Sequence, residues 1–202
     1  MTARYVIAAV PLLVAGALLT PHAATAAPTA STATPQALSL TLRDVQHAYG
    51  STFRPFLAHT YKASHKSACG ADYTGGYLTM FGNFGKASAT GAVVSVESVI
   101  FAYASSRSAA CASKAHGTSL ATVMGKSAAG TKVHASPLTG VGDSAYLFTV
   151  SSTKNRSYSI MIWLSRGTHI AMVTVSAVGR SPAQPTVIAL AKVIDGRLQA
   201  AG

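Results

Sequence analysis

The chain has 202 residues, and its 16 Lys and Arg residues against 5 Asp and Glu residues give it a formal net charge of +11. That length leaves room for one ordinary domain behind a leader, and the hydrophobic fraction of 49% is inflated by the leader and by alanine, so it does not indicate a membrane protein. The basic residues are scattered without forming a stripe, which argues against a nucleic-acid-binding protein.

The first 26 residues predict a secretory signal peptide. Arg4 is its only positive charge, an apolar run extends from Val6 to Leu19, and small residues lead up to a cleavage point after Ala26. The apolar run is shorter than the roughly 20 residues that a membrane-spanning helix needs. We therefore expect a cleaved leader and a secreted, extracytoplasmic protein, with an uncleaved signal anchor as the alternative. Since no cysteine lies near the cleavage point, lipid attachment there is excluded.

An uncharged stretch rich in Ala, Thr and Pro, residues 27–37, predicts a flexible linker. Residues 38–202 are then expected to form a single α+β extracytoplasmic domain without a further membrane-spanning segment. Loss of Arg4 with the leader leaves fifteen basic against five acidic residues, a mature net charge of +10. Anionic cell-wall or membrane-surface components are the expected partners of so basic an exported protein, although the same charge can simply keep its surface solvated.

Capping signals predict a helix over residues 39–50. Thr41 can cap its start, Val45 belongs to its apolar face and Gly50 ends it. Pro55 follows within a short apolar stretch and predicts a second helical turn or an irregular loop.

Two strands and a helix follow. Residues 73–84 place glycines among aromatic residues, as expected of a bulged or edge strand. Residues 91–103 are rich in β-branched side chains and predict a central strand. Ser105 or Ser106 can then cap an alanine-rich helix that extends toward residue 124.

The chain contains two cysteines, Cys69 and Cys111. In an oxidising compartment such a pair most often forms a disulfide, which here would join the alanine-rich helix to the start of the first strand. A zinc site that also used His65 and His116 is the alternative, but the spacings match no common zinc finger. We therefore expect a disulfide, no metal and no cofactor.

The second half of the domain reads as a turn at residues 140–143, a strand at 145–150 and a hairpin over 154–178, with Arg166 and Gly167 in the two-residue turn. Alternation puts two sets of hairpin side chains on opposite faces. One face holds Tyr158, Ile160, Ile162, Leu164, Ala171, Val173 and Val175, and the other holds Met161, Trp163, Ile170 and Met172.

Residues 181–200 predict a final helix with Pro185 in its first turn. Because the antiparallel hairpin excludes a doubly wound parallel fold, the sequence predicts an α+β domain with a small antiparallel sheet of about five strands. The expected order is helix, strand, strand, helix, three strands, helix. The apolar stripe of the last helix comprises Val187, Leu190, Ala191, Ile194 and Leu198.

Segments from residue 91 onward resemble a pattern shared by exported bacterial proteins. They are the strand VSVESVIFAY with the helix after it, the turn and strand GVGDSAYLFT, the hairpin WLSRGTHIAMVTV and the helix ALAKVIDGRL. Residues 91–200 are thereby similar to sensor-like extracellular domains of lipoproteins and receptor kinases. The resemblance implies a small antiparallel sheet with helices and a surface cleft for ligands, and it transfers no catalytic residue. The chain departs from these relatives in lacking both a lipidation cysteine and a kinase domain.

A Gly-Asp-Ser block at residues 142–144 resembles the nucleophile block of one esterase family. That block belongs near the mature N-terminus, with its Asp and His partners close together near the C-terminus. Here the block lies late, and His169 and Asp195 are far apart on separate elements. We therefore interpret it as a tight turn and assign no catalytic residue.

Glu97 and an apolar platform are the candidates for ligand binding. Glu97 is the only glutamate and lies in mid-strand, where it can line a cleft or face solvent. We expect the N-terminal helix to cover the platform, with an exposed ligand-binding surface as the alternative, and Tyr73, Tyr77 and Phe81 are expected near it. The platform consists of Met161, Trp163, Ile170 and Met172.

Three functions remain open from the sequence. The favoured one is an exported, non-enzymatic, sensor-like domain that binds a ligand or an anionic envelope polymer. The others are a secreted hydrolase with an unrecognised site and a structural or interaction protein of the cell surface.

Overall fold

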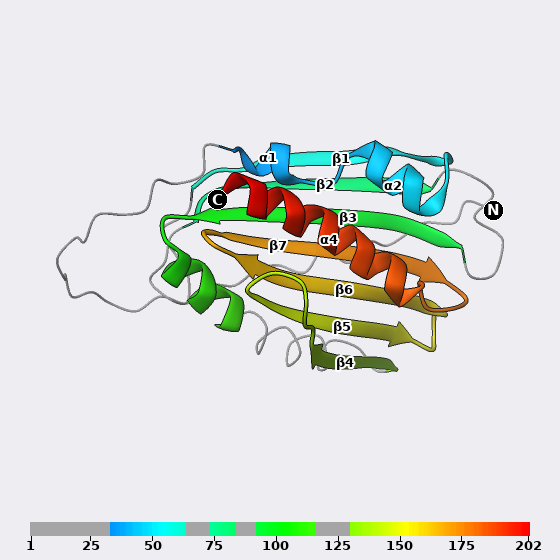
Figure 1. The fold of residues 1–202 in the computed structure, drawn as a ribbon. Helices are drawn as coiled ribbons and strands as arrows, with labels where there is room; N and C mark the ends of the chain where they lie inside the picture. Colours follow the sequence, from blue (N-terminus) through cyan, green and yellow to red (C-terminus); the bar gives the residue numbers. More distant parts are fainter. Residues whose placement is uncertain (1–32, 64–72, 84–91, 116–129) are drawn as a thin grey trace.

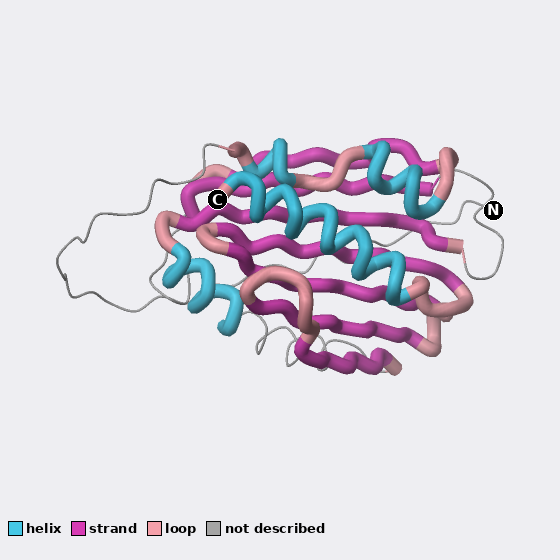
Figure 2. The backbone as a smooth tube through the Cα atoms, viewed as in Figure 1, coloured by secondary structure: helices cyan, strands magenta, loops and turns pink. Residues whose placement is uncertain are grey.

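The computed structural model describes residues 33–63, 73–83, 92–115 and 130–202. Its elements are arranged as one sheet with helices packed on it (Figures 1 and 2). The helices are α1 (Pro35–Leu38), α2 (Leu42–Tyr49), a helix at residues 106–115 and α4 (Gln184–Ala201). The strands are β1 (Phe53–Tyr61), β2 (Tyr73–Asn83), β3 (Val93–Tyr103), β4 (Thr131–Pro137), β5 (Ser144–Ser152), β6 (Ser157–Arg166) and β7 (His169–Val178).

The sheet has seven strands in the order β1-β2-β3-β7-β6-β5-β4, and every neighbouring pair is antiparallel. This confirms the α+β class and the antiparallel sheet. The predicted number of about five strands is wrong, because β1 was predicted as a helical turn or loop and no strand was predicted at β4. The five expected strands all form in the expected order.

Pro55, from which a helical turn or a loop was predicted, lies within strand β1. An outer strand has one edge without a ladder, so it tolerates a residue that lacks an N–H. The pairing of β1 with β2 shifts between Pro55 and Leu57, which is a β-bulge at Phe56. The prediction of a helical turn or loop here is therefore wrong.

Helices α1, α2 and α4 all pack on one face of the sheet, which we call the helix face (Figure 1). The stripe expected for α4, from Val187 to Leu198, is fully buried against it. The hairpin side chains Ile160, Ile162, Leu164, Ala171, Val173 and Val175 line the same core, which confirms the predicted alternation. Burial of each large aliphatic side chain in this core contributes roughly 1.5–3 kcal/mol.

The first predicted helix is confirmed as α2. Thr41 Oγ1 accepts from the backbone N–H of Asp44, and the Asp44 carboxylate accepts from the backbone N–H of Thr41, which completes a capping box. Gly50 ends the helix with a φ of +96°. Arg197 on α4 donates to both oxygens of Asp44, at 3.0 and 2.8 Å, and so ties α2 to α4. Although burial raises it, the Thr41 N–H and Arg197 together hold the pKa of Asp44 below its ordinary value.

Short helix α1 begins three residues before Leu38, where the folded domain was expected to start. Leu38 is buried in the core of the helix face, and Ala33 packs against that core. Within the described part of the chain, no helix combines the length and the apolarity needed to cross a bilayer.

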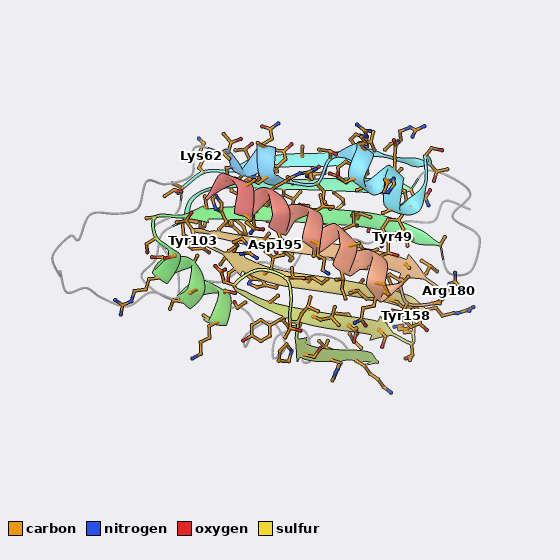
Figure 3. All side chains as sticks on the ribbon, in the orientation of Figure 1. Tyr49, Lys62, Tyr103, Tyr158, Arg180 and Asp195 are labelled. Carbon is orange, nitrogen blue, oxygen red and sulfur yellow. The ribbon has the colours of Figure 1, made fainter. Side chains whose placement is uncertain are left out.

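The β6–β7 turn consists of Gly167 and Thr168, because Arg166 pairs with His169. The predicted turn at Arg166 and Gly167 is therefore one residue too early. Gly167 has a φ of +53°, as the first central position of a type II′ turn requires. Arg166 instead ends β6 and forms ion pairs with Asp195 on α4 and with Asp143 (Asp195 in Figure 3).

The helix at residues 106–115 is capped by Ser105, whose Oγ accepts from the backbone N–H of Ser108 at 3.1 Å. This helix covers part of the other face of the sheet, which we call the second face. Trp163 Nε1 donates to Ser113 Oγ at 3.2 Å. The core between this helix and the second face comprises Tyr103, Ala109, Ala112, Phe148, Trp163 and Ile170. The expected cover of the Trp163 platform by the N-terminal helix is therefore wrong, since α1 and α2 lie on the helix face.

His169 makes the stability of the fold dependent on pH. It is buried, and burial lowers its pKa below the ordinary value of 6.5. The folded state thus favours the neutral imidazole of His169. The stability that the fold gains from a neutral His169 is fully present above pH 6.5 and is lost as the pH falls through the pKa of the folded state. We expect wild type to lose more free energy of unfolding than His169→Leu when urea unfolding is measured from about pH 8 down to about pH 5. Parallel pH profiles for the two proteins would contradict this.

Candidate functional site

Side chains on the second face form rows that run across the sheet, because paired residues of antiparallel strands lie side by side. The row we call the Glu97 row comprises Met80, Glu97, Thr174 and Met161, from β2, β3, β7 and β6. The adjacent Trp163 row comprises Leu78, Val99, Met172 and Trp163 from the same strands. On the other side of the Glu97 row, the serine row comprises Ser95, Ser176 and Ser159.

The structure brings all five predicted ligand-binding residues to the second face. Their accessibility differs, because the helix at residues 106–115 covers one part of that face. Trp163 is 7% exposed and Ile170 is fully buried, so both belong to the core beneath this helix. The other three predicted residues, Glu97, Met161 and Met172, are half-buried, as are Met80 and Thr174 beside them. We call these five residues the open half.

Two of the aromatic residues expected beside the platform lie elsewhere. Tyr77 pairs with Ile100, and Phe81 is buried in the core of the helix face, so both point away from Trp163. Tyr73 does pack against the core beneath the helix at 106–115. The expectation is thus correct for Tyr73 and wrong for Tyr77 and Phe81.

An aromatic cluster that the sequence did not indicate borders the second face at the β1 side. The ring of Phe101 lies 5.4 Å from that of Tyr61 and 5.1 Å from that of Tyr73. Phe101 lies directly over Gly76, where a Cβ atom would come within 2.6 Å of its ring. Tyr61 could not be placed here from the sequence, because it belongs to β1, which was predicted to be a helical turn or a loop on account of Pro55.

Glu97 is the acid that sets this face apart. Among the described residues it forms no hydrogen bond and no ion pair, whereas Asp44, Asp143 and Asp195 each pair with an arginine. Burial raises the pKa of Glu97 above its ordinary value of 4.5. The pKa of Tyr61 is raised too, first by burial and then by the negative charge of Glu97.

Thr174 lies directly across from Glu97 in the pairing of β3 with β7. Its Oγ1 is buried and has no hydrogen-bond partner among the described residues. One row away, Ser159 and Ser176 satisfy each other, with their hydroxyl oxygens 2.9 Å apart. The open half therefore places a carboxylate and an unsatisfied hydroxyl beside half-buried methionines.

Glu97 should cost the protein stability at neutral pH. We expect Glu97→Gln to raise the free energy of unfolding at pH 7 by about 1 kcal/mol, because it removes a charge held without a partner in a partly buried place. The pKa of Glu97 is raised in the folded state, so its protonated carboxyl stabilises the fold relative to the ionised one. This stabilisation is present below pH 4.5 and is lost as the pH rises through the pKa of the folded state. The advantage of glutamine should therefore grow from about pH 4 to about pH 7 in urea unfolding. An advantage that does not change with pH would contradict this assignment.

The Gly-Asp-Ser block at residues 142–144 forms a turn, as interpreted. The backbone N–H of Asp143 donates to the carbonyl of Ser165 at 2.7 Å, and the Asp143 carboxylate accepts from the N–H of Gly167 at 2.8 Å. Ser144 Oγ lies 2.8 Å from Ser165 Oγ. These contacts hold the turn against the β6–β7 hairpin.

The predicted disulfide stays a prediction. Cys111 lies on the exposed side of the helix at residues 106–115, and Cys69 lies outside the described residues. His65 and His116, the other members of the alternative zinc site, lie outside them as well. No cluster of three His, Cys, Asp or Glu side chains suited to a metal occurs in the described part of the chain.

A shallow groove of about 780 Å³ lies between α2 and α4, on the opposite side of the molecule from the open half. Its lining includes Arg43, His47, Pro185, Leu190 and Val193. None of these residues was predicted to bind a ligand. The groove is therefore a second place where a small molecule could bind, and it has to be distinguished experimentally from the open half.

No protein-family model matches the chain, and no curated protein matches it in sequence. Among solved structures, the chain is similar to the extracellular domain of PknH from Mycobacterium tuberculosis, with a TM-score of 0.58 and 11% sequence identity. The similarity covers 82% of this chain and 94% of that domain. At this identity the similarity shows a shared fold alone, and it covers more of the chain than residues 91–200.

Proposed function

We propose that the protein is an exported, non-enzymatic, sensor-like domain whose ligand binds the open half of the second face. The observation that carries this is the composition of the open half, where an unpaired carboxylate and an unsatisfied hydroxyl adjoin half-buried methionines. Methionine side chains adapt their shape to a bound molecule at little cost. Small-molecule sites combine mostly apolar side chains with a few polar groups, and the open half has that composition.

The extracytoplasmic location rests on the predicted leader, and the fold shared with an extracellular domain supports it. Mass spectrometry of the exported protein should find a mature chain that begins at Ala27, after cleavage behind Ala26. An intact Met1 on protein recovered from the cytosol would contradict both the leader and the location.

The ligand surface can be tested with methyl NMR of methionine-labelled protein, since the chain contains only 5 methionines. Hits from a library of small amphiphilic molecules are expected to shift the methyl signals of Met80, Met161 and Met172 together. Met161→Ala and Met172→Ala should each weaken such hits several-fold. Val193→Ala, in the groove between α2 and α4, serves as the control and should leave them unchanged. Hits that depend on Val193 and leave the three methyl signals unshifted would contradict the proposal.

A second proposed function, binding to an anionic envelope polymer, is favoured by a basic cluster at one end of the sheet. The backbone N–H of Gly179 donates to the carbonyl of Arg156 at 2.7 Å, which brings the β5–β6 turn beside the segment after β7. Lys154, Arg156 and Arg180 are all exposed there, and Figure 3 shows Arg180 at the same end of the sheet as Tyr158. Clustered cations raise the local concentration of polyanions.

Retention on purified bacterial cell wall tests the basic cluster. Changing Lys154, Arg156 and Arg180 together to glutamine should reduce retention strongly and weaken its salt dependence. The control removes the same charge elsewhere, by changing the exposed residues Lys62, Arg107 and Lys192 to glutamine. If both triple variants lose retention equally, net charge alone accounts for binding and the cluster is not a site.

A further inference from the structure

We propose that the ligand of the open half carries a positively charged nitrogen, which pairs with Glu97, on an apolar body that lies on Met161 and Met172. This inference rests on the proposed ligand surface and specifies the chemical class of the molecule that binds there. It follows from charge pairing, from the polar atoms around Glu97 and from the apolar side chains of the neighbouring row.

The first argument is the pairing of acids with bases across the molecule. Bases outnumber acids by 16 to 5, so an acid has many potential partners, and Asp44, Asp143 and Asp195 have each acquired an arginine. Glu97 has no such partner among the described residues. No Lys or Arg stands in the Glu97 row or the Trp163 row, and His59, at the β1 end of the Trp163 row, is an exposed residue. The described residues therefore offer Glu97 no cation, and a positively charged ligand would supply one.

The second argument is the hydrogen-bonding capacity around Glu97. A carboxylate accepts hydrogen bonds through both oxygens, and a protonated amine donates as many as three. Thr174 Oγ1 is buried beside Glu97 without a partner among the described residues, and it can accept one of them once its side chain rotates toward the ligand. A charge-assisted hydrogen bond in this partly desolvated place is shorter and stronger than one between neutral groups. An ammonium group thus satisfies two polar groups that the described residues leave unpaired.

The third argument concerns the rest of the ligand. Met161 lies across from Thr174 in the Glu97 row, and Met172 lies two residues before Thr174 on β7. Residues two apart on a strand are separated by about 6.5–7 Å. That distance fits a phenyl ring or a short alkyl chain attached to the amine. An anionic ligand would instead meet Glu97 without a compensating cation, so the face selects against it.

The inference can be tested with three probes of one shape, phenethylamine, 2-phenylethanol and phenylacetate, which are cationic, neutral and anionic at pH 7. Dissociation constants are measured from the methyl shifts of Met80, Met161 and Met172 at physiological salt. We expect phenethylamine to bind about tenfold or more tighter than 2-phenylethanol, which is the effect of one hydrogen-bonded charge. Phenylacetate should bind more weakly than either.

Glu97→Gln should lower the affinity for phenethylamine about tenfold and leave that for 2-phenylethanol unchanged. Asp143→Asn, which removes one negative charge at an exposed site elsewhere, is the control and should change neither. Equal binding of the three probes, or an amine preference that survives Glu97→Gln, would overturn the cationic ligand and leave the ligand surface standing. If no probe and no library hit shifts the three methyl signals, the surface itself is wrong.

Discussion

Gly142→Ala is expected to lower the free energy of unfolding by about 2–4 kcal/mol, one of the two largest effects anticipated for this protein. Gly142 has a φ of +63°, a left-handed conformation that costs an alanine about 1 kcal/mol or more. A Cβ atom at this position would also come within 2.6 Å of the Ser165 carbonyl oxygen. The Cβ position is fixed by the backbone and the oxygen belongs to the backbone, so the clash cannot be relieved by rotating a side chain.

The turn at Gly142 contacts several elements, so a displacement of this turn would weaken its contacts with each of them. The backbone N–H of Gly142 bonds to Asp195 on α4, and Asp143 bonds to the β6–β7 hairpin. Val141, one residue before, is buried in the core of the helix face. Moving the turn outward would weaken all three attachments.

Gly140 is the matched control for Gly142. It has a similar φ of +76°, but a Cβ atom there would meet no atom within 4 Å. Gly140→Ala should therefore cost only the conformational part, about 1 kcal/mol. Urea unfolding of both variants measures the difference as a shift in midpoint at constant slope. Equal destabilisation by the two substitutions would show that the contact with Ser165 is unimportant.

The second large effect is expected from the predicted disulfide. Cys111→Ser should lower the free energy of unfolding by about 4 kcal/mol, because a cross-link that closes a loop of about forty residues removes that much entropy from the unfolded chain. The helix at residues 106–115 covers Trp163 and Ile170, so its loosening should also expose the only tryptophan to solvent. Thermal unfolding followed by tryptophan fluorescence reports both changes.

Cys69→Ser should reproduce the effect of Cys111→Ser, and the double variant should be no less stable than either single one. A reductant should lower the melting temperature of wild type and leave the variants unchanged. A wild-type melting temperature that does not respond to reductant, or zinc bound to the purified protein, would contradict the disulfide.

The elements predicted correctly are those whose signals are local or strongly periodic. α4 shows the apolar spacing of a helix packed on one side, and its five predicted core residues are the ones that are buried. α2 carries its own capping residues, Thr41 and Gly50, so its bounds follow from neighbouring residues alone.

The elements that were missed are the outer strands, where the usual signals of a strand are weakest. β4 is seven residues long and largely exposed, so it has little apolar alternation. β1 contains a proline, which an interior strand would exclude, and a bulge that interrupts the alternation of its side chains. An outer strand has a neighbour on one side only, and that neighbour is chosen by the tertiary fold.

The candidate site was predictable in part. Alternation along single strands placed Met161, Trp163, Ile170 and Met172 on one face, and the structure adds Glu97 to it through the pairing of β3 with β7. Which of them are accessible depends on where the helix at residues 106–115 packs, and an alanine-rich helix shows little pattern from which to infer that. The lack of a partner for Glu97 is a property of the assembled fold and has no local signal.

The two outer strands have a consequence for how separate molecules behave in solution. Among the described residues, β1 and β4 each pair with another strand on one side only, and an outer edge of this kind can recruit a strand from a neighbouring copy. Pro55 and the bulge interrupt the outer edge of β1, and Lys132 and Pro137 lie in β4. Two copies approaching margin to margin would also bring together two strongly positive bodies. The surplus of basic residues therefore opposes intermolecular sheet growth, a role in keeping the protein dispersed that requires no binding partner.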